Sequence, residues 1–244
     1  MKRFLLLALI ATTTFAQTNR RSVAPHDSFA SNQQTLPVVA NTVGLGGAVF
    51  RSYVAILNPT PSSFDVTASF FDASGTKKDA TINLAPGEMK VFGNFLATVF
   101  AATGGGAVTF SSSDPANRFI VSSEVQVNDF STPVPSLEFA GSNSRSFAPG
   151  ISVNSESRTN VGCFNESDAT NTIKATVLDT TGKLTVGSVT LTLPPRAWGQ
   201  TAINSVVSDG VVQFDPSDSA VCYAVVVDNH TNDGRFISAA EYRP

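Results

Sequence analysis

The sequence predicts an all-β protein made of two tandem antiparallel β-sandwich domains. The first observation is an internal repeat, because residues 51–58 read RSYVAILN and residues 158–165 read RTNVGCFN, 107 positions later (158 − 51). The same spacing separates Asp72 from Asp179. The second observation is a series of short segments, separated by turn residues, with no long helical periodicity between them. A repeat of this length gives each unit an ordinary domain size and its own core.

The composition of the 244-residue chain fits this fold class and excludes several functions. Charged residues make up 14% of the chain and hydrophobic residues 42%, whereas about 25% charged residues are usual in a soluble domain. Ser, Thr, Val and Phe fill the gap, and these residues suit half-buried pleated surfaces. The net charge is −3, and no basic cluster appears beyond the start of the chain. Nucleic-acid binding and anionic-membrane binding therefore have no electrostatic basis.

Residues 1–16 are predicted to be a secretory signal peptide. Lys2 and Arg3 precede a short apolar run over residues 4–10, and small residues suit cleavage before Gln17. The run is shorter than the ~20 apolar residues that cross a bilayer, and no later stretch is long enough. We therefore expect no membrane span after cleavage. The mature protein is expected to be secreted, either periplasmic or extracellular, and exposed to oxidising conditions.

The first sandwich is expected over residues 35–140, after a flexible polar arm over residues 17–34. Pro59 ends the first strong strand, and Gly75 supplies the left-handed position of a later turn. Residues 96–102 are the only apolar stretch that suggests a helical turn. Strands are expected over residues 36–40, 50–58, 64–72, 80–84, 89–95, 107–111, 119–127 and 137–140.

The second sandwich is expected over residues 147–244, after a flexible Gly- and Ser-rich linker over residues 141–146. Its turns recur at matching places, with Gly182 in the place of Gly75. Its strands are expected over residues 161–165, 172–179, 189–193, 197–203, 211–214, 220–228 and 236–239.

The two cysteines, Cys163 and Cys222, both lie in the second domain, and export favours a disulfide between them. They occupy the first strong strand and the penultimate strand, which can face each other across the core of a Greek-key sandwich. The bridge would stabilise the domain by roughly 4 kcal/mol in the chain-entropy model. Two buried free thiols are the alternative. The first domain has Ile56 at the place of Cys163, and Val121 or Ser122 near that of Cys222, so it must rely on packing.

No residue pattern identifies a catalytic centre, and we predict a non-enzymatic protein without a cofactor. His26 lies in the polar arm and His230 in a polar loop, and no G-x-S-x-G elbow accompanies either of them. No pair of acidic residues stands in an aromatic setting that suits glycoside hydrolysis.

The polar loop over residues 228–234, which reads DNHTNDG, has two interpretations. The oxygen atoms between Asp228 and Asp233 could bind calcium, although Gly234 comes one residue too late for the standard calcium-binding loop. A hairpin turn rich in Asn and Asp is the simpler interpretation. We therefore assign no metal ligand.

The repeated Arg51 and Arg158 begin a strand, and the repeated Asn58 and Asn165 end it. They could form a binding pair that the chain displays twice. They could equally be structural, with an ion pair at the edge and an Asn side chain bonded to the turn backbone. We favour the structural interpretation, because a repeat preserves folding instructions first.

The repeated strand resembles a motif of a poorly characterised bacterial family. Residues 50–59, FRSYVAILNP, and residues 158–165 are similar to its F-R-T-D/N-L-x-L-x-N-P strand, and residues 226–237, VVDNHTNDGRFI, resemble its V-V-D-N-R-T-G-D hairpin. The resemblance implies exported tandem immunoglobulin-like β-sandwich units, free-standing or appended to secreted hydrolases. Ser157 departs from it where an aromatic is usual, and His230 where Arg is usual. The resemblance transfers no catalytic residue.

From the sequence we therefore expect an exported structural, adhesion or surface-assembly module. Its partner would be a protein or a glycan, and self-association through exposed strand edges is a further expectation. A carbohydrate- or calcium-dependent binding module is the alternative, for which Tyr53, Trp198 and Tyr242 could stack on sugars. An enzyme is the third interpretation.

Overall fold

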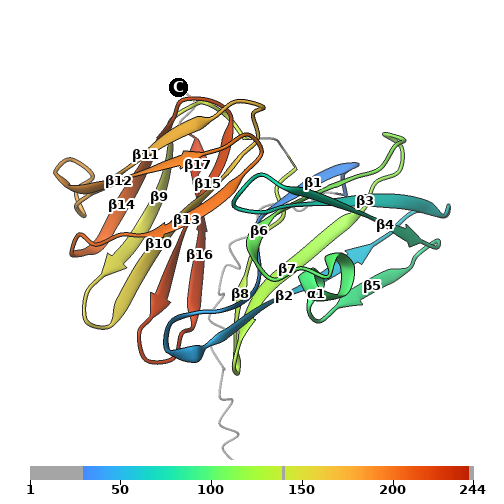
Figure 1. Cartoon of the computed structure of the whole chain (residues 1–244), viewed down its shortest axis with the longest axis horizontal. Coiled ribbons are helices and arrows are strands. Elements are labelled where there is room, and N and C mark those ends of the chain that lie inside the picture. Colours follow the sequence, from blue (N-terminus) through green and yellow to red (C-terminus); the bar gives the residue numbers. More distant parts are fainter. Residues whose placement is uncertain (1–29, 139–140, 242–244) are drawn as a thin grey trace, which may run out of the picture.

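The structure, a computed structural model, describes residues 30–138 and 141–241 and is almost entirely β-sheet (Figure 1). Within these residues seventeen strands are joined by short connections, a 3-10 turn, η1 (Leu45–Gly47), and one helix, α1 (Phe95–Phe100). The all-β class is thus confirmed. The helix lies where a helical turn was expected, and the Asn94 side chain caps it by accepting a hydrogen bond from the Ala97 amide.

The first half of the chain folds into two antiparallel layers that one strand joins. The layers are β4-β3-β6-β1 and β5-β2-β7-β8. Strand β1 pairs with β6 along most of its length, and from Asn41 onward it also pairs with β2, so the layers merge at one corner. The strands are β1 (Gln33–Val43), β2 (Val49–Leu57), β3 (Phe64–Phe71), β4 (Lys77–Leu84), β5 (Met89–Phe92), β6 (Gly104–Ser111), β7 (Ile120–Val127) and β8 (Phe130–Pro133).

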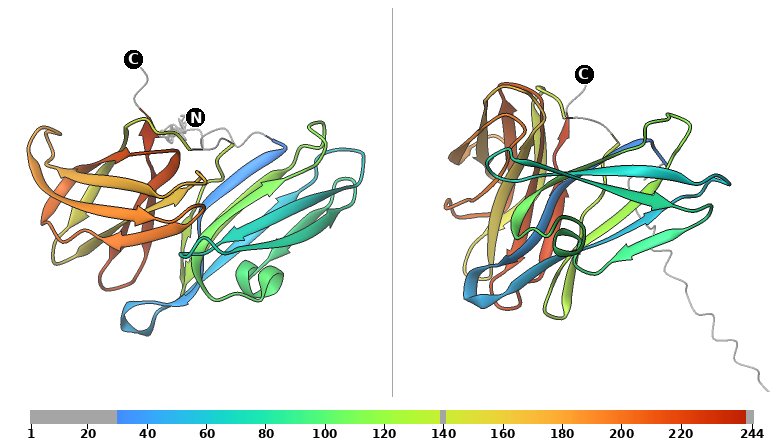
Figure 2. Two further views of the ribbon diagram at one scale, coloured as in Figure 1. Left: turned by 45° about the horizontal axis from the view of Figure 1, so that its top comes forward. Right: turned by 45° about the vertical axis from the view of Figure 1, so that its right-hand side comes forward.

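The second half repeats this strand order. Its layers are β12-β11-β14-β9-β17 and β13-β10-β15-β16, which match the first pair strand for strand except for the added β17. The two halves lie side by side (Figure 2). The strands are β9 (Ser146–Val153), β10 (Ser157–Asn165), β11 (Asn171–Leu178), β12 (Thr185–Leu193), β13 (Trp198–Ala202), β14 (Val207–Pro216), β15 (Ala220–Asp228), β16 (Gly234–Ser238) and β17 (Ala240–Glu241).

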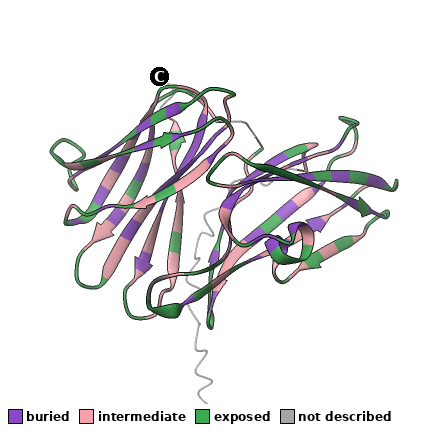
Figure 3. Cartoon of the chain, in the orientation of Figure 1, coloured by how far each residue is buried: buried purple, intermediate pink, exposed green. Residues whose placement is uncertain are grey.

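Each half has a buried hydrophobic cluster between its two layers (Figure 3). Strands β3 and β11 show the repeat most clearly, because their bounds differ by 107 residues (171 − 64, 178 − 71). Alternate side chains of both strands enter the clusters. These side chains are Val66, Ala68 and Phe70 in the first half and Ile173, Ala175 and Val177 in the second.

The polar arm is shorter than expected. Ser31 pairs with Phe119, and Gln34 is buried within β1. The Gln34 amide nitrogen donates to the Phe119 carbonyl at 2.6 Å, and its oxygen accepts the Val121 amide at 3.1 Å. These bonds satisfy the Gln34 side chain, which is why this polar residue can be buried. The predicted signal peptide and the rest of the arm, residues 1–29, lie outside the described residues.

The predicted linker over residues 141–146 makes backbone and side-chain contacts with the second half. Ser142 forms an antiparallel bridge with Ala220. The Ser219 hydroxyl donates to the Gly141 carbonyl at 2.6 Å, and Arg145 pairs with Asp215 at 2.6 Å. The linker therefore packs along the second half instead of acting as a spacer.

Two strands near this linker also differ from expectation. Strand β9 begins at Ser146 and was not predicted, because Pro149 and Gly150 are typical turn residues. Register shifts between β9 and β14 accommodate them. Leu137 forms only an isolated bridge with Thr35, and the end of the predicted strand over residues 137–140 lies outside the described residues.

Candidate functional site

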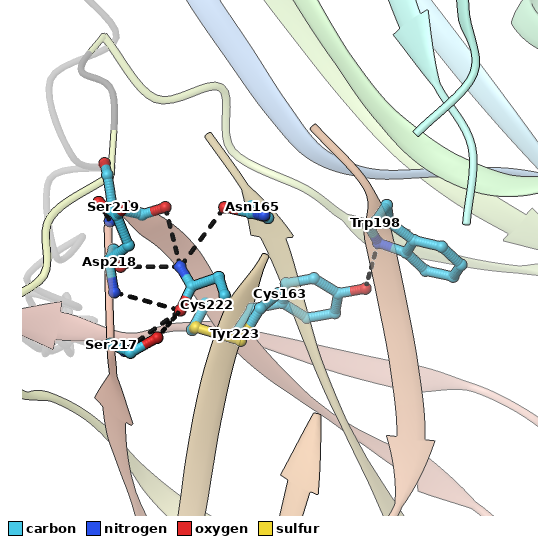
Figure 4. Close-up of a disulfide and its surroundings, with 9 residues drawn as sticks. Cys163, Asn165, Trp198, Ser217, Asp218, Ser219, Cys222 and Tyr223 are labelled. Carbon is cyan, nitrogen blue, oxygen red and sulfur yellow. Dashed lines mark hydrogen bonds between the residues drawn. A yellow bond between two sulfur atoms is a disulfide. The ribbon is translucent and has the colours of Figure 1, made fainter. Parts of the chain in front are cut away.

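The predicted disulfide between Cys163 and Cys222 is confirmed, but its placement differs from the prediction (Figure 4). The two residues are direct register partners on the adjacent strands β10 and β15, with 4.1 Å between their Cα atoms. The bridge thus joins neighbours within one layer and does not cross the core. Ile56 and Val121 are the register partners at the same place in the first half, and both are buried.

The repeated asparagines fasten the turns around them, which confirms the structural interpretation. Asn165 is fully buried, and its amide nitrogen donates to the carbonyls of Ala169, Leu193 and Pro194 at 2.8, 3.3 and 2.7 Å. Its oxygen accepts the Ser167 amide at 3.0 Å. Each bond satisfies a backbone group where a strand gives way to a turn.

Asn58 makes the equivalent contacts in the first half. It is also fully buried, and its amide nitrogen donates to the carbonyls of Ser62, Leu84 and Ala85 at 2.8, 3.3 and 3.0 Å. Its oxygen accepts the Thr60 amide at 2.9 Å. The Asn that ends the repeated segment therefore stabilises the fold in both copies.

The Arg158 side chain holds the polar loop over residues 228–234 and does not form the expected ion pair. Its guanidinium donates to the Asn229 side-chain oxygen at 3.1 Å and to that of Asn232 at 2.7 Å. Partial burial lowers the pKa of Arg158, while the charge of Asp228 opposes that shift. The side-chain oxygens of Asn229 and Asn232 are thus already bound by a cation, the Arg158 guanidinium. Within the described residues, no group of three His, Cys, Asp or Glu side chains is placed to hold a metal ion.

The Asp228 carboxylate organises the turn of the same loop. It accepts hydrogen bonds from the amides of His230 and Thr231 at 2.8 and 2.7 Å, and these bonds hold its pKa below the ordinary value. His230 pairs with Glu156 at 3.0 Å on the exposed surface. The Asn- and Asp-rich composition is thus accounted for by a hairpin turn. His26 and Tyr242 lie outside the described residues.

A hydrogen-bonded aromatic group lies on the outer face of β13 and β15, toward the first half (Figure 4). The Trp198 indole nitrogen donates to the Tyr223 hydroxyl at 3.0 Å, and this hydroxyl donates to Gln200 at 3.0 Å. Phe236 stacks on Tyr223 with ring centres 5.0 Å apart. Tyr223 is fully buried, and burial raises the pKa of its hydroxyl.

These aromatic side chains join the two halves. Phe164 packs against Phe71 of β3 with ring centres 5.2 Å apart. The Trp198 backbone amide donates to the Asp72 carbonyl at 3.1 Å. The Trp198 ring lies directly over Gly105, where a Cβ atom would come within 2.8 Å of it. Side chains from both halves thus exclude water from the boundary. We call this contact between the halves the joint.

The joint was not predicted from the sequence. Trp198, Tyr223 and Gln200 lie on two strands, and only the strand register brings them together. The repeat did not mark the position either, because the spacing of 107 residues places Val91 opposite Trp198 (198 − 107), whereas the strand register places Met89 there.

A polar cleft of about 490 Å³ lies next to the joint and takes residues from both halves. Glu166 is a half-buried acid of this cleft, and it accepts a hydrogen bond from the Gly141 amide. Burial raises its pKa to about 7, against the opposing effects of that bond and of Arg196. The lining includes Gln33, Thr35, Ser69, Lys77, Thr109, Ser111, Glu138, Glu166, Arg196 and Ser219.

Charges at the cleft are largely paired with neighbours outside it. Lys77 pairs with Asp79 at 3.0 Å, and Arg196 pairs with Asp168 at 2.8 Å. The buried aromatic residues of the lining form no open stacking platform, because Phe71 and Phe164 pack against each other in the joint and Phe110 packs in the core of the first half. The arrangement offers hydrogen bonds to a small polar ligand, and the Ser69 hydroxyl of the lining already donates to the Asp79 carboxylate at 2.5 Å.

Comparison with known proteins identifies no family for this chain. No family model matches it, and no curated protein matches it. One solved structure is similar, that of Bacteroides uniformis beta-glucuronidase 2 covalently bound to cyclophellitol-6-carboxylate aziridine. The TM-score is 0.18 at 12% identity, over 89% of this chain and 27% of that chain. A likeness at this level carries no argument about fold or activity.

No helix in the described part of the chain has the length and hydrophobicity of a membrane-spanning segment.

Proposed function

We propose that this chain is an exported, non-enzymatic structural module that serves adhesion or assembly at a cell surface. The observation that supports it most is the joint, in which Phe164, Trp198 and Tyr223 lie between the two halves. Domains that move during catalysis or ligand capture usually meet through small, polar interfaces. A buried aromatic contact instead favours a fixed spacing of the two halves, as a structural module requires.

The disulfide supports the proposed location. Cys163 and Cys222 form a buried bridge, and such bridges persist mainly in oxidising compartments outside the cytosol. The resemblance of the repeated strand to exported tandem sandwich units points to the same location. The partner in this proposal is a protein or glycan of the cell surface.

A binding assay on the natural protein, and on a variant with an altered joint, tests the proposal. We expect the full mature chain to bind saturably to envelope material from its own producing cells. Trp198→Ala should loosen the joint and weaken that binding at least tenfold. Tyr53→Phe, a change at a half-buried side chain of β2 away from the joint, should leave it unaltered. Turnover of any compound in a panel of glycosides, esters and peptides, or binding indifferent to Trp198→Ala, would overturn the proposal.

The polar cleft supports a second candidate, a carbohydrate-binding module. Its volume of about 490 Å³ suits a small ligand, and hydroxyl, amide and charged groups line it. A bulky side chain at a lining position should block such a ligand. We expect Thr109→Trp to abolish glycan-array binding and Thr190→Trp, at an exposed position of β12 in the second half, to preserve it. Equal binding by both variants would exclude the cleft, and comparison with and without calcium would separate a calcium-dependent mode.

A further inference from the structure

The polar cleft beside the joint lies between one surface from each half. Its floor is the outer face of the layer β4-β3-β6-β1 in the first half. The floor residues alternate along their strands with residues of the hydrophobic core, so their side chains point away from that core. The wall belongs to the second half and consists of Phe164, Glu166, Arg196 and Ser219. A ligand in the cleft therefore contacts both halves.

The floor carries rows of hydroxyl and amide groups. Thr109 of β6 is the register partner of Ser69 on β3 and of Thr35 on β1. Ser111 and Gln33 are register partners in the next row of the same face. Hydroxyl and amide groups both donate and accept hydrogen bonds. Such a floor matches the hydroxyl groups of a sugar ring.

The two cations of the lining bring no net charge to the cleft. Lys77 pairs with Asp79 at 3.0 Å, and Arg196 pairs with Asp168 at 2.8 Å. Each positive charge is thus balanced by a carboxylate beside it. A negatively charged ligand has no unpaired cation to bind.

The remaining charges of the lining are acidic. Glu138 is exposed and forms no ion pair within the described residues. Glu166 is half-buried in the wall, where the Gly141 amide donates to one of its oxygens. The acids around the cleft thus outnumber the cations by four to two, with Asp79, Asp168, Glu138 and Glu166 against Lys77 and Arg196. An acid in a partly dry site favours a positively charged partner.

We propose that the cleft binds a sugar that carries a free ammonium group. This inference rests on the second candidate function, the carbohydrate-binding module, and names the class of sugar for that site. The ammonium group binds Glu166 at the wall, and the ring hydroxyls bind the row of Ser69 and Thr109 on the floor. An ammonium group has three donors and no acceptor, so it suits a carboxylate that has only one printed donor. A volume of about 490 Å³ is within the range of small-ligand sites.

Calorimetric titration of the full mature chain at pH 7 tests the ligand class. The probes are methyl glucosaminide, methyl N-acetylglucosaminide, methyl glucoside and ethylamine. We expect methyl glucosaminide to bind at least tenfold more tightly than each of the others, because it alone combines the charge with the ring. Equal binding of the three glycosides, or equal binding of ethylamine and methyl glucosaminide, would overturn the proposal.

Matched variants locate the bound ammonium group. Glu166→Gln keeps the shape of the side chain and should weaken binding of methyl glucosaminide at least tenfold. Glu156→Gln removes an equal charge from an exposed hairpin outside the cleft and should leave binding unaltered. Equal loss in both variants would mean that only the overall charge of the protein matters, and it would refute the assignment to Glu166.

The pH dependence of binding provides a second readout. The pKa of Glu166 is raised to about 7 by burial, so the proton returns to this carboxyl below pH 7. A cation must displace that proton, and the amine of the ligand stays mostly protonated in this range. We expect the affinity to fall at least about fivefold between pH 7 and pH 5.5 in the natural protein and to stay level in Glu166→Gln. The other charged groups of the lining are Lys77, Glu138 and Arg196, and none of the described lining residues is a histidine. A natural protein with level affinity would contradict the proposal.

Failure of this inference is distinguishable from failure of the second candidate function. Glycan binding that Thr109→Trp abolishes, without preference for the ammonium group, would retain the cleft as a carbohydrate site and reject the proposed ligand class. Glycan binding that neither Thr109→Trp nor Glu166→Gln alters would reject both.

Discussion

The Trp198 indole nitrogen and the Tyr223 hydroxyl are 3.0 Å apart and form the polar centre of an otherwise apolar joint. Tyr223 is fully buried, so its hydroxyl has lost water as a partner and depends on the indole and on Gln200. The side chains of Trp198, Tyr223 and Gln200 thus find their partners within the second half, while the Trp198 backbone amide bonds to the Asp72 carbonyl of the first half. The apolar rings remain free to contact the first half. The bond therefore orients the surface on which the first half rests.

Removal of the Tyr223 hydroxyl should destabilise the protein. We expect Tyr223→Phe to lower the free energy of unfolding by about 1–2 kcal/mol, because the Trp198 nitrogen loses its acceptor. Chemical denaturation measures the change. The same substitution at Tyr53, which is only half-buried, should cost less than about 0.5 kcal/mol. A double-mutant cycle with Trp198→Phe should show coupling, and strictly additive effects would contradict the proposed bond.

The disulfide should make the second half the more stable one. Loss of the bridge in Cys163→Ala/Cys222→Ala should cost roughly 4 kcal/mol, chiefly by relaxing the unfolded chain. Hydrogen exchange, which reports each strand separately, should show β10 and β15 better protected than β2 and β7 in the oxidised protein. Removal of the bridge should reduce or reverse this difference. A second half that exchanges faster even when oxidised would contradict the prediction.

The first half has a position equivalent to the natural disulfide, at which a second bridge should increase its stability. Ile56 and Val121 are buried register partners at the place of the natural bridge. We expect Ile56→Cys/Val121→Cys to form a second disulfide under oxidation and to protect β2 and β7 from exchange. Reduction of this variant should leave it less stable than the natural protein by about 2–4 kcal/mol, because two large apolar side chains are lost. Free thiols after oxidation would show that the two backbones do not match here.

The sequence was sufficient for the all-β class and for most strands along the chain, and insufficient for the contacts between strands. Turn residues and the repeated Asn58 and Asn165 act locally, so the positions of most strands could be derived from them. Cys163 and Cys222 were paired correctly, but spacing alone does not distinguish neighbours in one layer from partners across the core. The joint was missed because Trp198 and Tyr223 meet only through strand register. Gln34 was assigned to the arm because an amide that bonds to distant backbone groups looks like a surface residue.

Glu166 should make the stability depend on pH. Its pKa is raised from 4.5 to about 7 in the folded protein by burial. Between these values the unfolded chain has released the proton and the folded protein has kept it. The contribution of Glu166 to stability is therefore highest below about pH 4.5, falls as the pH rises to about 7, and is then level, with a total loss of no more than about 3 kcal/mol.

Glu166→Gln should remove this dependence. The amide has nothing to ionise, so we expect a flatter stability curve between about pH 5 and 8 and a gain over the natural protein at pH 8. Thermal unfolding across this pH range is the measurement. Glu138→Gln provides the control, because Glu138 lines the same cleft but is exposed. An unaltered pH dependence in Glu166→Gln would mean that another group controls it.

The buried asparagines should be the most sensitive polar positions of the fold. Asn165→Ala removes the buried amide that donates to the carbonyls of Ala169, Leu193 and Pro194, and Asn58→Ala removes the equivalent donor in the first half. Each lost hydrogen bond costs about 1 kcal/mol, so we expect each variant to lose at least about 2–3 kcal/mol. Asn83→Ala, which removes only an exposed bond to Asp65, should cost less than about 0.5 kcal/mol. Similar losses in both halves would establish that the repeated Asn performs one structural task twice, whereas a neutral Asn58→Ala would confine that task to the second half.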